Sequence, residues 1–236
     1  MSDDPQPSGS WLGEERAAGE VPLGDAEVGW IADDVAAEFP ELGLRFLELP
    51  AVRGRSPGSV RQRLADRSDR FRGSHALLMR QEPIPWAYRV FFRHIGLDPD
   101  EQRTPIEALA VRRLLEGAFK SDNLLEDALT LSLLETSVPV WAVDADQRSG
   151  PLGIRLATRG ESLGEGELSP RLPRGRLVVA DRERPLAVLF GDVAPDRAVR
   201  SRSRRMVLFT VQVAGVPEIH VEEALWNCLE VLSEAR

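Results

Sequence analysis

Cysteine is nearly absent from this 236-residue sequence, which contains only Cys228. A single cysteine excludes an internal disulfide and any zinc site built from several thiolates, and its apolar surroundings in the last expected helix favour a buried side chain. We therefore expect a protein of the reducing cytoplasm. Long apolar runs are also missing: no stretch approaches the roughly 18 residues of a membrane span. The acidic, polar N-terminus is unlike a signal peptide.

Positive charge is scarce overall. The net charge is −8 and Lys120 is the only lysine, so the chain lacks the broad basic surface of a protein that coats nucleic acid. Arginine is nonetheless concentrated in two stretches: residues 51–93 hold ten arginines against three acids, and residues 196–205 read DRAVRSRSRR. Both stretches could contact phosphates locally. The alternative is a solvated helix face for the first and an exposed loop for the second.

Recognisable catalytic motifs are missing as well. There is neither a glycine loop that cradles phosphates nor a serine nucleophile elbow. His220 and Glu223 fall one helical turn apart, yet no third metal ligand accompanies them, so we expect no metal or other cofactor. Glu135, Asp144 and Asp146 could supply paired carboxylates for acid–base chemistry. The competing interpretation is that the two aspartates hold a turn where a strand ends.

Proline, glycine, serine and acids dominate residues 1–22, which predicts a disordered acidic tail. Residues 25–236 are expected to form a single domain. Apolar residues in the segment 25–39 recur at intervals of three and four, which predicts a helix; they are Val28, Ile31, Val35 and Phe39.

Helical patterns dominate the next part of the chain, and short apolar runs dominate the rest. Helices are expected at 59–71, 84–95, 104–117, 121–135 and 217–234. Strands are expected at 44–49, 138–143, 152–157, 176–180, 185–190 and 206–213. Thr104, Pro105 and Glu107 form a capping box, and Ser121 or Asp122 is the expected cap of the next helix. This order predicts an α+β fold, in which a helical N-terminal half packs on a mixed or antiparallel sheet closed by a C-terminal helix.

Three segments of the second half carry a family resemblance. They read DNLLEDALTLSLLETSVPVWAVDADQRSGPLGIRLATRGESL, GRLVVADRERPLAVLFGD and RSRRMVLFTVQVAGV. Their order resembles the B3/B4 editing domain of the phenylalanyl-tRNA synthetase beta subunit. The matching positions are Asp127, Pro139, Asp144, Arg155, Ala157, Gly160, Glu161, Val178, Ala180, Asp181, Gly191 and Asp192.

Residues 84–115 are similar to the N-terminal half of the free-standing proteins of this family. Seven positions carry that similarity: Trp86, Tyr88, Arg89, Gly96, Pro99, Arg103 and Glu107. The resemblance thus covers roughly residues 25–236. It implies a B3/B4-type fold and the hydrolysis of an amino acid wrongly esterified to tRNA. Such a reaction needs no strong nucleophile, since an ester is already activated and a positioned water suffices.

The resemblance also implies a site and a partner. Thr130, Glu135 and Asp192 are the expected catalytic residues, and Trp141, Asp127 and Asp196 the expected substrate-binding residues. The aminoacylated 3′ end of a tRNA is the expected partner. Its phosphates are expected to contact Arg89, Arg103, Arg197 and Arg200. For Arg89 and Arg103, a buried or interfacial ion pair with a helix acid is an equal alternative.

Two positions depart from the family pattern. Trp141 stands where the synthetase pocket has a histidine, and Thr130 stands where it has an asparagine. Trp141 could fill part of the pocket or belong to the core, and Asp196 competes with Asp192 for the acidic position. An alternative function is therefore a non-catalytic module that binds a free amino acid or related small molecule. The amino acid and the oligomeric state stay open.

Overall fold

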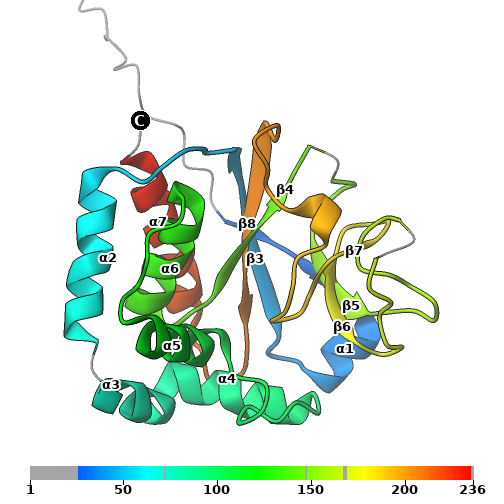
Figure 1. The fold of residues 1–236 in the computed structure, drawn as a ribbon. Helices are drawn as coiled ribbons and strands as arrows, with labels where there is room; N and C mark the ends of the chain where they lie inside the picture. Colours follow the sequence, from blue (N-terminus) through cyan, green and yellow to red (C-terminus); the bar gives the residue numbers. More distant parts are fainter. Residues whose placement is uncertain (1–25, 72, 147, 167–168, 235–236) are drawn as a thin grey trace, which may run out of the picture.

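The structure, a computed structural model, describes residues 26–71, 73–146, 148–166 and 169–234. The expected acidic tail, residues 1–22, lies outside this part of the chain. Within the described residues, the strands form two four-stranded sheets. Figure 1 shows helices on one side of the first sheet, with the second sheet and its loops on the other.

The first sheet is antiparallel throughout and has the strand order β1-β3-β8-β4. Its strands are β1 (Glu27–Val28), β3 (Gly43–Pro50), β8 (Arg205–Gln212) and β4 (Val140–Asp144). The long central strand β8 is buried along most of its length. It pairs with β3, from the N-terminal part of the chain, on one side and with β4, from the middle of the chain, on the other.

The second sheet has the order β2-β5-β6-β7 and is mixed, because β2 pairs parallel to β5 while the other pairs are antiparallel. Its strands are β2 (Trp30–Ile31), β5 (Gly153–Leu156), β6 (Leu177–Ala180) and β7 (Pro185–Val188). Strand β6 is buried at every position, which is typical of a strand covered on both faces.

Helices α2, α6 and α7 stand together on one side of the first sheet, and α4 runs along its lower end in the view of Figure 1. The helices are α1 (Asp33–Glu38), α2 (Gly58–Arg70), α3 (Gly73–Leu78), α4 (Pro83–His94), α5 (Pro105–Glu116), α6 (Leu124–Thr136) and α7 (Glu218–Ser233). Two 3-10 turns, η1 (Met79–Gln81) and η2 (Pro195–Arg197), complete the described elements. None of these helices combines the length and the apolar character needed to cross a membrane.

Buried polar contacts fasten the helices to one another and to the sheet. The Ser132 hydroxyl on α6 donates to the Ala224 carbonyl of α7 at 2.7 Å, and the Tyr88 hydroxyl on α4 donates to the Val211 carbonyl of β8 at 2.9 Å. Cys228 is buried between α7 and α6, and this burial raises the pKa of its thiol to about 12. The thiol is therefore protonated at neutral pH and is no nucleophile.

The expected α+β fold class is confirmed, and most expected elements lie within a few residues of their predicted bounds. The helix expected over residues 25–39 was wrong, since only α1 is helical and two short strands precede it. Between those strands lies Gly29, where a Cβ would come within 2.6 Å of Leu44 Cδ2 and 2.9 Å of the Leu152 carbonyl oxygen. The chain crosses there from one sheet to the other, and this tertiary pairing overrides the helical spacing.

The N-cap of α6 lies one residue after Asp122 and two residues after Ser121, the two expected caps. Its N-cap is Asn123, whose side chain accepts a hydrogen bond from the Glu126 backbone N–H at 3.1 Å. Ser121 and Asp122 instead donate to the Asp127 carboxylate, the former from its hydroxyl and the latter from its backbone N–H. The residue types favoured at a cap were present at three successive positions, and the Asp127 carboxylate decides between them.

The capping box of α5 is confirmed: the Glu107 carboxylate accepts from the Thr104 backbone N–H at 3.2 Å and from its hydroxyl at 2.8 Å. We expect Thr104→Ala to lower the free energy of unfolding by about 1–2 kcal/mol, because the cap hydroxyl is lost at a fully buried position. Urea denaturation measures this change. Thr158→Ala, at an exposed loop residue, is the control, and an equal effect of both variants would contradict the prediction.

Candidate functional site

A cavity of about 510 Å³ lies between α5, α6, the start of β4 and the turn that follows β7. Its lining consists of Pro105, Ala108, Leu109, Arg112, Glu126, Leu129, Thr130, Leu133, Pro139, Val140, Trp141 and Asp192. This volume falls in the range of small-molecule sites, which are mostly apolar with a few polar groups. The cavity brings together three of the residues expected from the sequence, Thr130, Trp141 and Asp192.

Helix α6 presents one continuous face to the cavity. Glu126, Leu129, Thr130 and Leu133 all line it, and intervals of three and four residues place side chains on one side of a helix. Thr130 is half-buried there. The Thr130 hydroxyl is thus available to a ligand.

Trp141 forms part of the cavity wall and also belongs to the packed interior. Its ring stacks on Phe209 of the neighbouring strand β8, with centroids 5.6 Å apart and an interplanar angle of 13°. A second contact, edge-on at 5.7 Å, joins it to Phe190. Trp141 therefore both lines the cavity and packs in the core, the two alternatives weighed from the sequence.

Asp192 reaches the cavity from a tight turn of the chain. The Val188 backbone N–H donates to the Asp192 carbonyl oxygen at 2.9 Å, and at the tip Phe190 has a φ of 59°, in the left-handed region. The Phe190 ring packs against an aromatic cluster formed by Tyr88, Phe91, Phe92 and Trp141. These contacts hold an uncommon backbone conformation, and they leave Asp192 exposed at the cavity.

The cavity contains two charged residues that the sequence analysis missed, Glu126 and Arg112. Although Glu126 is exposed as a residue, burial raises the pKa of its carboxyl above the usual value, the charges of Asp122 and Asp127 add to this, and Arg112 opposes it. Helical spacing could have identified Glu126, because it precedes Thr130 by four residues on an expected helix. That interval places both on one face.

Glu135 lies outside the cavity, although it shares α6 with Thr130. The Arg67 guanidinium donates to its carboxylate at 2.8 Å, and Arg63 and Asn227 lie 3.5 Å from it. Five residues of helix turn a side chain by about 140° relative to Thr130. In the structure Glu135 therefore joins α6 to α2 and α7.

Asp127 is buried and also lies outside the cavity. Its carboxylate accepts hydrogen bonds from the Ser56 and Ser121 hydroxyls and from the Asp122 backbone N–H. These contacts tie the loop before α2 to the start of α6. Asp127 thus positions the helix that carries Glu126 and Thr130.

Asp144 and Asp146 hold the turn at the end of β4. Asp144 accepts from the Ser203 hydroxyl and from the Asp146 backbone N–H, and Asp146 accepts from the backbone N–H groups of Arg204 and Arg205. The hydrogen bond from Arg204 is the main reason why the pKa of Asp146 is lowered. This is the turn-holding role that was weighed against acid–base chemistry.

The expected phosphate-contacting arginines differ in exposure. Arg103 and Arg200 are exposed. Arg197 is 1% exposed, and its guanidinium lies 3.5 Å from Asp196, which also lies 3.8 Å from Arg184. Asp196 does not line the cavity.

Arg89 is buried in a network of charged side chains and is not accessible to solvent. Its guanidinium donates to Glu107 at 2.5 Å and to Asp100 at 2.7 Å, and Arg80 approaches the same Glu107 oxygen at 2.8 Å. Glu107 itself is 2% exposed. The ion-pair alternative weighed from the sequence describes this arrangement.

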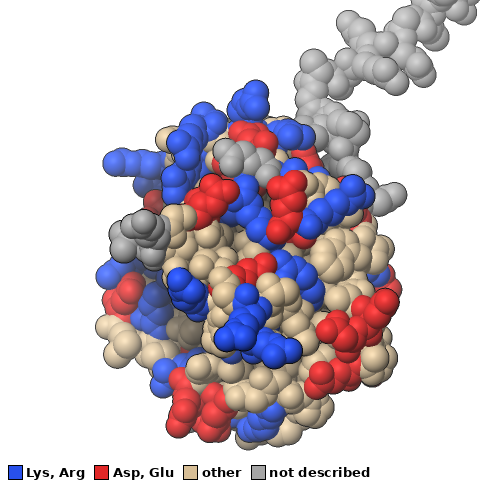
Figure 2. Space-filling model, turned by 90° about the vertical axis from the view of Figure 1, so that its right-hand side faces the viewer, with Lys and Arg blue, Asp and Glu red and all other residues tan. Residues whose placement is uncertain are grey.

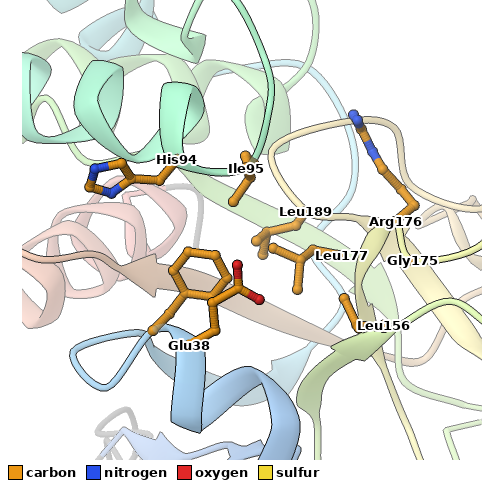
Figure 3. Close-up of a pocket in the computed structure, with 9 residues that line it drawn as sticks. Glu38, His94, Ile95, Leu156, Gly175, Arg176, Leu177 and Leu189 are labelled. Atoms are coloured by element: carbon orange, nitrogen blue, oxygen red, sulfur yellow. The ribbon is translucent and has the colours of Figure 1, made fainter.

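A second cavity, of about 190 Å³, lies between the ends of α1 and α4 and the second sheet. Figure 3 shows Leu177 and Leu189 toward its middle, with the Glu38 carboxylate beside them, while the Arg176 side chain points away. Leu189 lines this cavity and Asp192 lines the first one, so the segment that follows β7 contributes to both cavities. Within the described residues, no three His, Cys, Asp or Glu side chains gather as a metal site would require.

Charges are mixed on the face formed by the second sheet and its loops. Figure 2 shows Lys and Arg side chains next to Asp and Glu, with uncharged surface between them. No continuous basic area covers this view. On this face, contact with a nucleic acid would therefore depend on individual arginines.

Comparison with known proteins assigns the family. The model of the B3/4 domain matches residues 87–213, more than half of the chain. Phenylalanine–tRNA ligase beta subunits are similar: that of Yersinia pestis is 30% identical over 128 residues, 52% of this chain and 14% of the relative. That of Legionella pneumophila (strain Lens) is 26% identical over 151 residues, 61% of this chain and 18% of the relative. The match thus spans only a small part of these relatives' length, and the chain belongs to the B3/4 domain family.

Proposed function

We propose that this protein hydrolyses the ester bond of a mischarged aminoacyl-tRNA, as the free-standing family members that it resembles would do. One observation carries the proposal: Thr130, Trp141 and Asp192 line one cavity that opens to solvent. Thr130 and Trp141 stand where the synthetase pocket has an asparagine and a histidine. The cavity has room for an aminoacyl group, and its acidic side chains suit the α-ammonium group that such an ester carries.

The chemistry fits a cavity without a strong nucleophile. An aminoacyl ester needs only a positioned water and groups that stabilise charge as the water attacks. Hydrolysis after the charging step has a physical rationale as well. A pocket distinguishes amino acids that differ by one small group by only about 10- to 200-fold, so errors must be removed later.

Two arginines, one just before α5 and one on it, offer a path for the RNA. Arg103 and Arg112 both line a shallow depression on the outer side of α5, and Arg112 also lines the cavity. A single-stranded 3′ end crossing this depression would meet Arg103 first and Arg112 next. Binding should then weaken with added salt, because each neutralised phosphate releases counterions.

The protein is expected to release amino acid from at least one member of a panel of mischarged tRNAs. Acid-precipitable radiolabel in the aminoacyl group measures the loss over time, and correctly charged tRNAs supply the comparison. A rate no higher than spontaneous hydrolysis for every member would contradict the proposal. Arg103→Ala should weaken tRNA binding and reduce its salt dependence, whereas Arg159→Ala, also exposed but outside the α5 depression, should leave both unchanged.

A second function is supported by the charges in the cavity. Arg112 together with Glu126 or Asp192 offers opposite charges that suit the carboxylate and ammonium groups of a free amino acid. In this case the protein would bind an amino acid without catalysis. A ligand at 100 times its dissociation constant should stabilise the fold by about 2.7 kcal/mol. Thermal unfolding with single amino acids measures this, and stabilisation without hydrolysis of any tRNA would favour this second function.

A further inference from the structure

The Glu126 carboxylate differs from the other acids of α6 in its lack of a hydrogen-bond or ion-pair partner among the residues that the structure describes. Within the described residues, no hydrogen bond or ion pair reaches its oxygens, whereas Asp127 and Glu135 accept hydrogen bonds from several donors. Its backbone N–H is engaged by the Asn123 cap, which fixes the first turn of the helix. The side chain lines the cavity with Thr130 one turn further along. Glu126 is therefore held in place by its backbone but is free at its carboxylate.

Charges from each neighbouring element act on this carboxylate. Asp122 and Asp127, from its own segment, make ionisation less favourable, as does burial, while Arg112 from α5 favours it. Asp192, from the turn after β7, adds a further negative charge to the same cavity. Burial is the main reason why the pKa of Glu126 is raised, and the charges of Asp122 and Asp127 add to this. A raised pKa means a stronger base once the group is ionised, which improves proton acceptance near neutral pH.

We propose that Glu126 is the general base of this cavity, accepting a proton from the water that attacks the aminoacyl ester. This inference rests on the proposed hydrolysis. The water oxygen bonds to the ester carbonyl carbon while one water proton moves to Glu126. The bond from that carbon to the ribose oxygen then breaks, and the ribose oxygen takes the proton back from Glu126. The products are the free amino acid and a tRNA with its hydroxyl restored.

The roles of the other charged residues follow from their positions. Thr130, on the same face of α6, can hydrogen-bond the attacking water. Asp192 comes from a different wall and remains available to the α-ammonium group of the substrate. Glu126 would thereby supply the acid–base group that a histidine cannot supply here, because Trp141 occupies that position and packs on Phe209.

The test is Glu126→Gln, which keeps the size of the side chain and removes its basicity. We expect the variant to lose about 100- to 10,000-fold in kcat/KM, the usual contribution of general acid–base catalysis. It should bind a non-hydrolysable aminoacyl-adenosine amide within about threefold of the wild type, since a group that acts on the attacking water contributes to the transition state and little to ground-state binding. It should also melt at or above the wild-type temperature, because an ionised carboxylate with a raised pKa opposes folding. Glu41→Gln, at an exposed residue that lines neither the cavity nor the α5 depression, is the control and should behave as the wild type.

The pH profile separates a base from a structural residue. The ionised form is active, so the wild-type rate should rise with pH through a midpoint above about 4.3, the ordinary value of a glutamate. Glu126→Gln should lack this rise. The inference is overturned if Glu126→Gln keeps more than about a third of the activity, or if the rise persists in the variant. It is equally overturned if analogue binding falls as far as the rate. Failure of the wild type to hydrolyse any mischarged tRNA would overturn the proposed function too, so the two failures are distinguishable.

Discussion

Arg89→Met is expected to destabilise the protein by about 3 kcal/mol or more, one of the two largest effects that we anticipate. The substitution keeps much of the apolar stem but leaves Glu107, which is 2% exposed, without its closest cation. Breaking a buried ion pair from one side costs about 3–5 kcal/mol, because the remaining charge stays desolvated. The lower end applies here, since Arg80 still contacts the same oxygen of Glu107. Urea denaturation at neutral pH measures the difference.

Two variants control this experiment. Arg93→Met removes an exposed arginine from the same helix, whose guanidinium lies 5.7 Å from the Trp86 ring centroid; it should cost no more than about 1 kcal/mol. Adding Glu107→Gln to Arg89→Met should recover part of the loss, because the uncompensated charge is then gone. If Arg89→Met and Arg93→Met had the same free energy of unfolding, the buried ion pair between Arg89 and Glu107 would contribute less to stability than we expect.

Ala108→Trp is expected to reduce hydrolysis of the best mischarged tRNA at least about 100-fold, because a misplacement of the reacting groups by about 1 Å can already cost that much. Ala108 is exposed on α5 and lines the cavity. An indole at this position would occupy the space proposed for the aminoacyl group without disturbing the core. The rate of ester cleavage, together with the melting temperature, measures the result.

The matched variant is Val111→Trp on the same helix. Val111 lines the outer depression but not the cavity, so this variant carries the same added bulk outside the proposed site. It should keep the catalytic rate of the wild type and change only tRNA affinity. Equal activity of Ala108→Trp and the wild type would show that the reaction takes place elsewhere, for example in the second cavity beside Leu189.

Much of the fold could be predicted because it depends on local signals. The capping box at Thr104 and Glu107 sets the start of α5, and Gly117 ends that helix with a φ of 81°. The strand patterns after Pro139 were also sufficient, since alternating or fully buried apolar runs need no partner to be recognised. The N-terminal segment failed because its apolar spacing fits a helix, whereas Gly29 lies where two sheets meet.

Of the site residues expected from the sequence, only those whose side chains face the cavity line it in the structure. Thr130 and Glu135 were both expected to be catalytic, yet α6 turns them to different sides, and Arg67 holds Glu135. Helical periodicity could have separated the two residues and could have drawn attention to Glu126. A buried ion pair was one of two alternatives for Arg89, but residue types could not choose between them. The burial of Arg197 was not predicted at all, because an arginine in a charge-rich stretch is usually exposed.

The sequence by itself determined the family resemblance, the α+β class, the limits of most helices and strands, and three of the residues that line the cavity. These depend on the order of residues and on spacing along single elements. Only the tertiary structure decided that α5, α6, β4 and the turn after β7 enclose one space. It also decided that Glu126 lines this space with no hydrogen bond to its carboxylate from the described residues, whereas Glu135 lies outside it and accepts a hydrogen bond from Arg67. The physical reason is that a side chain's burial, partners and pKa are set by elements distant in the sequence, whose packing the local pattern does not encode.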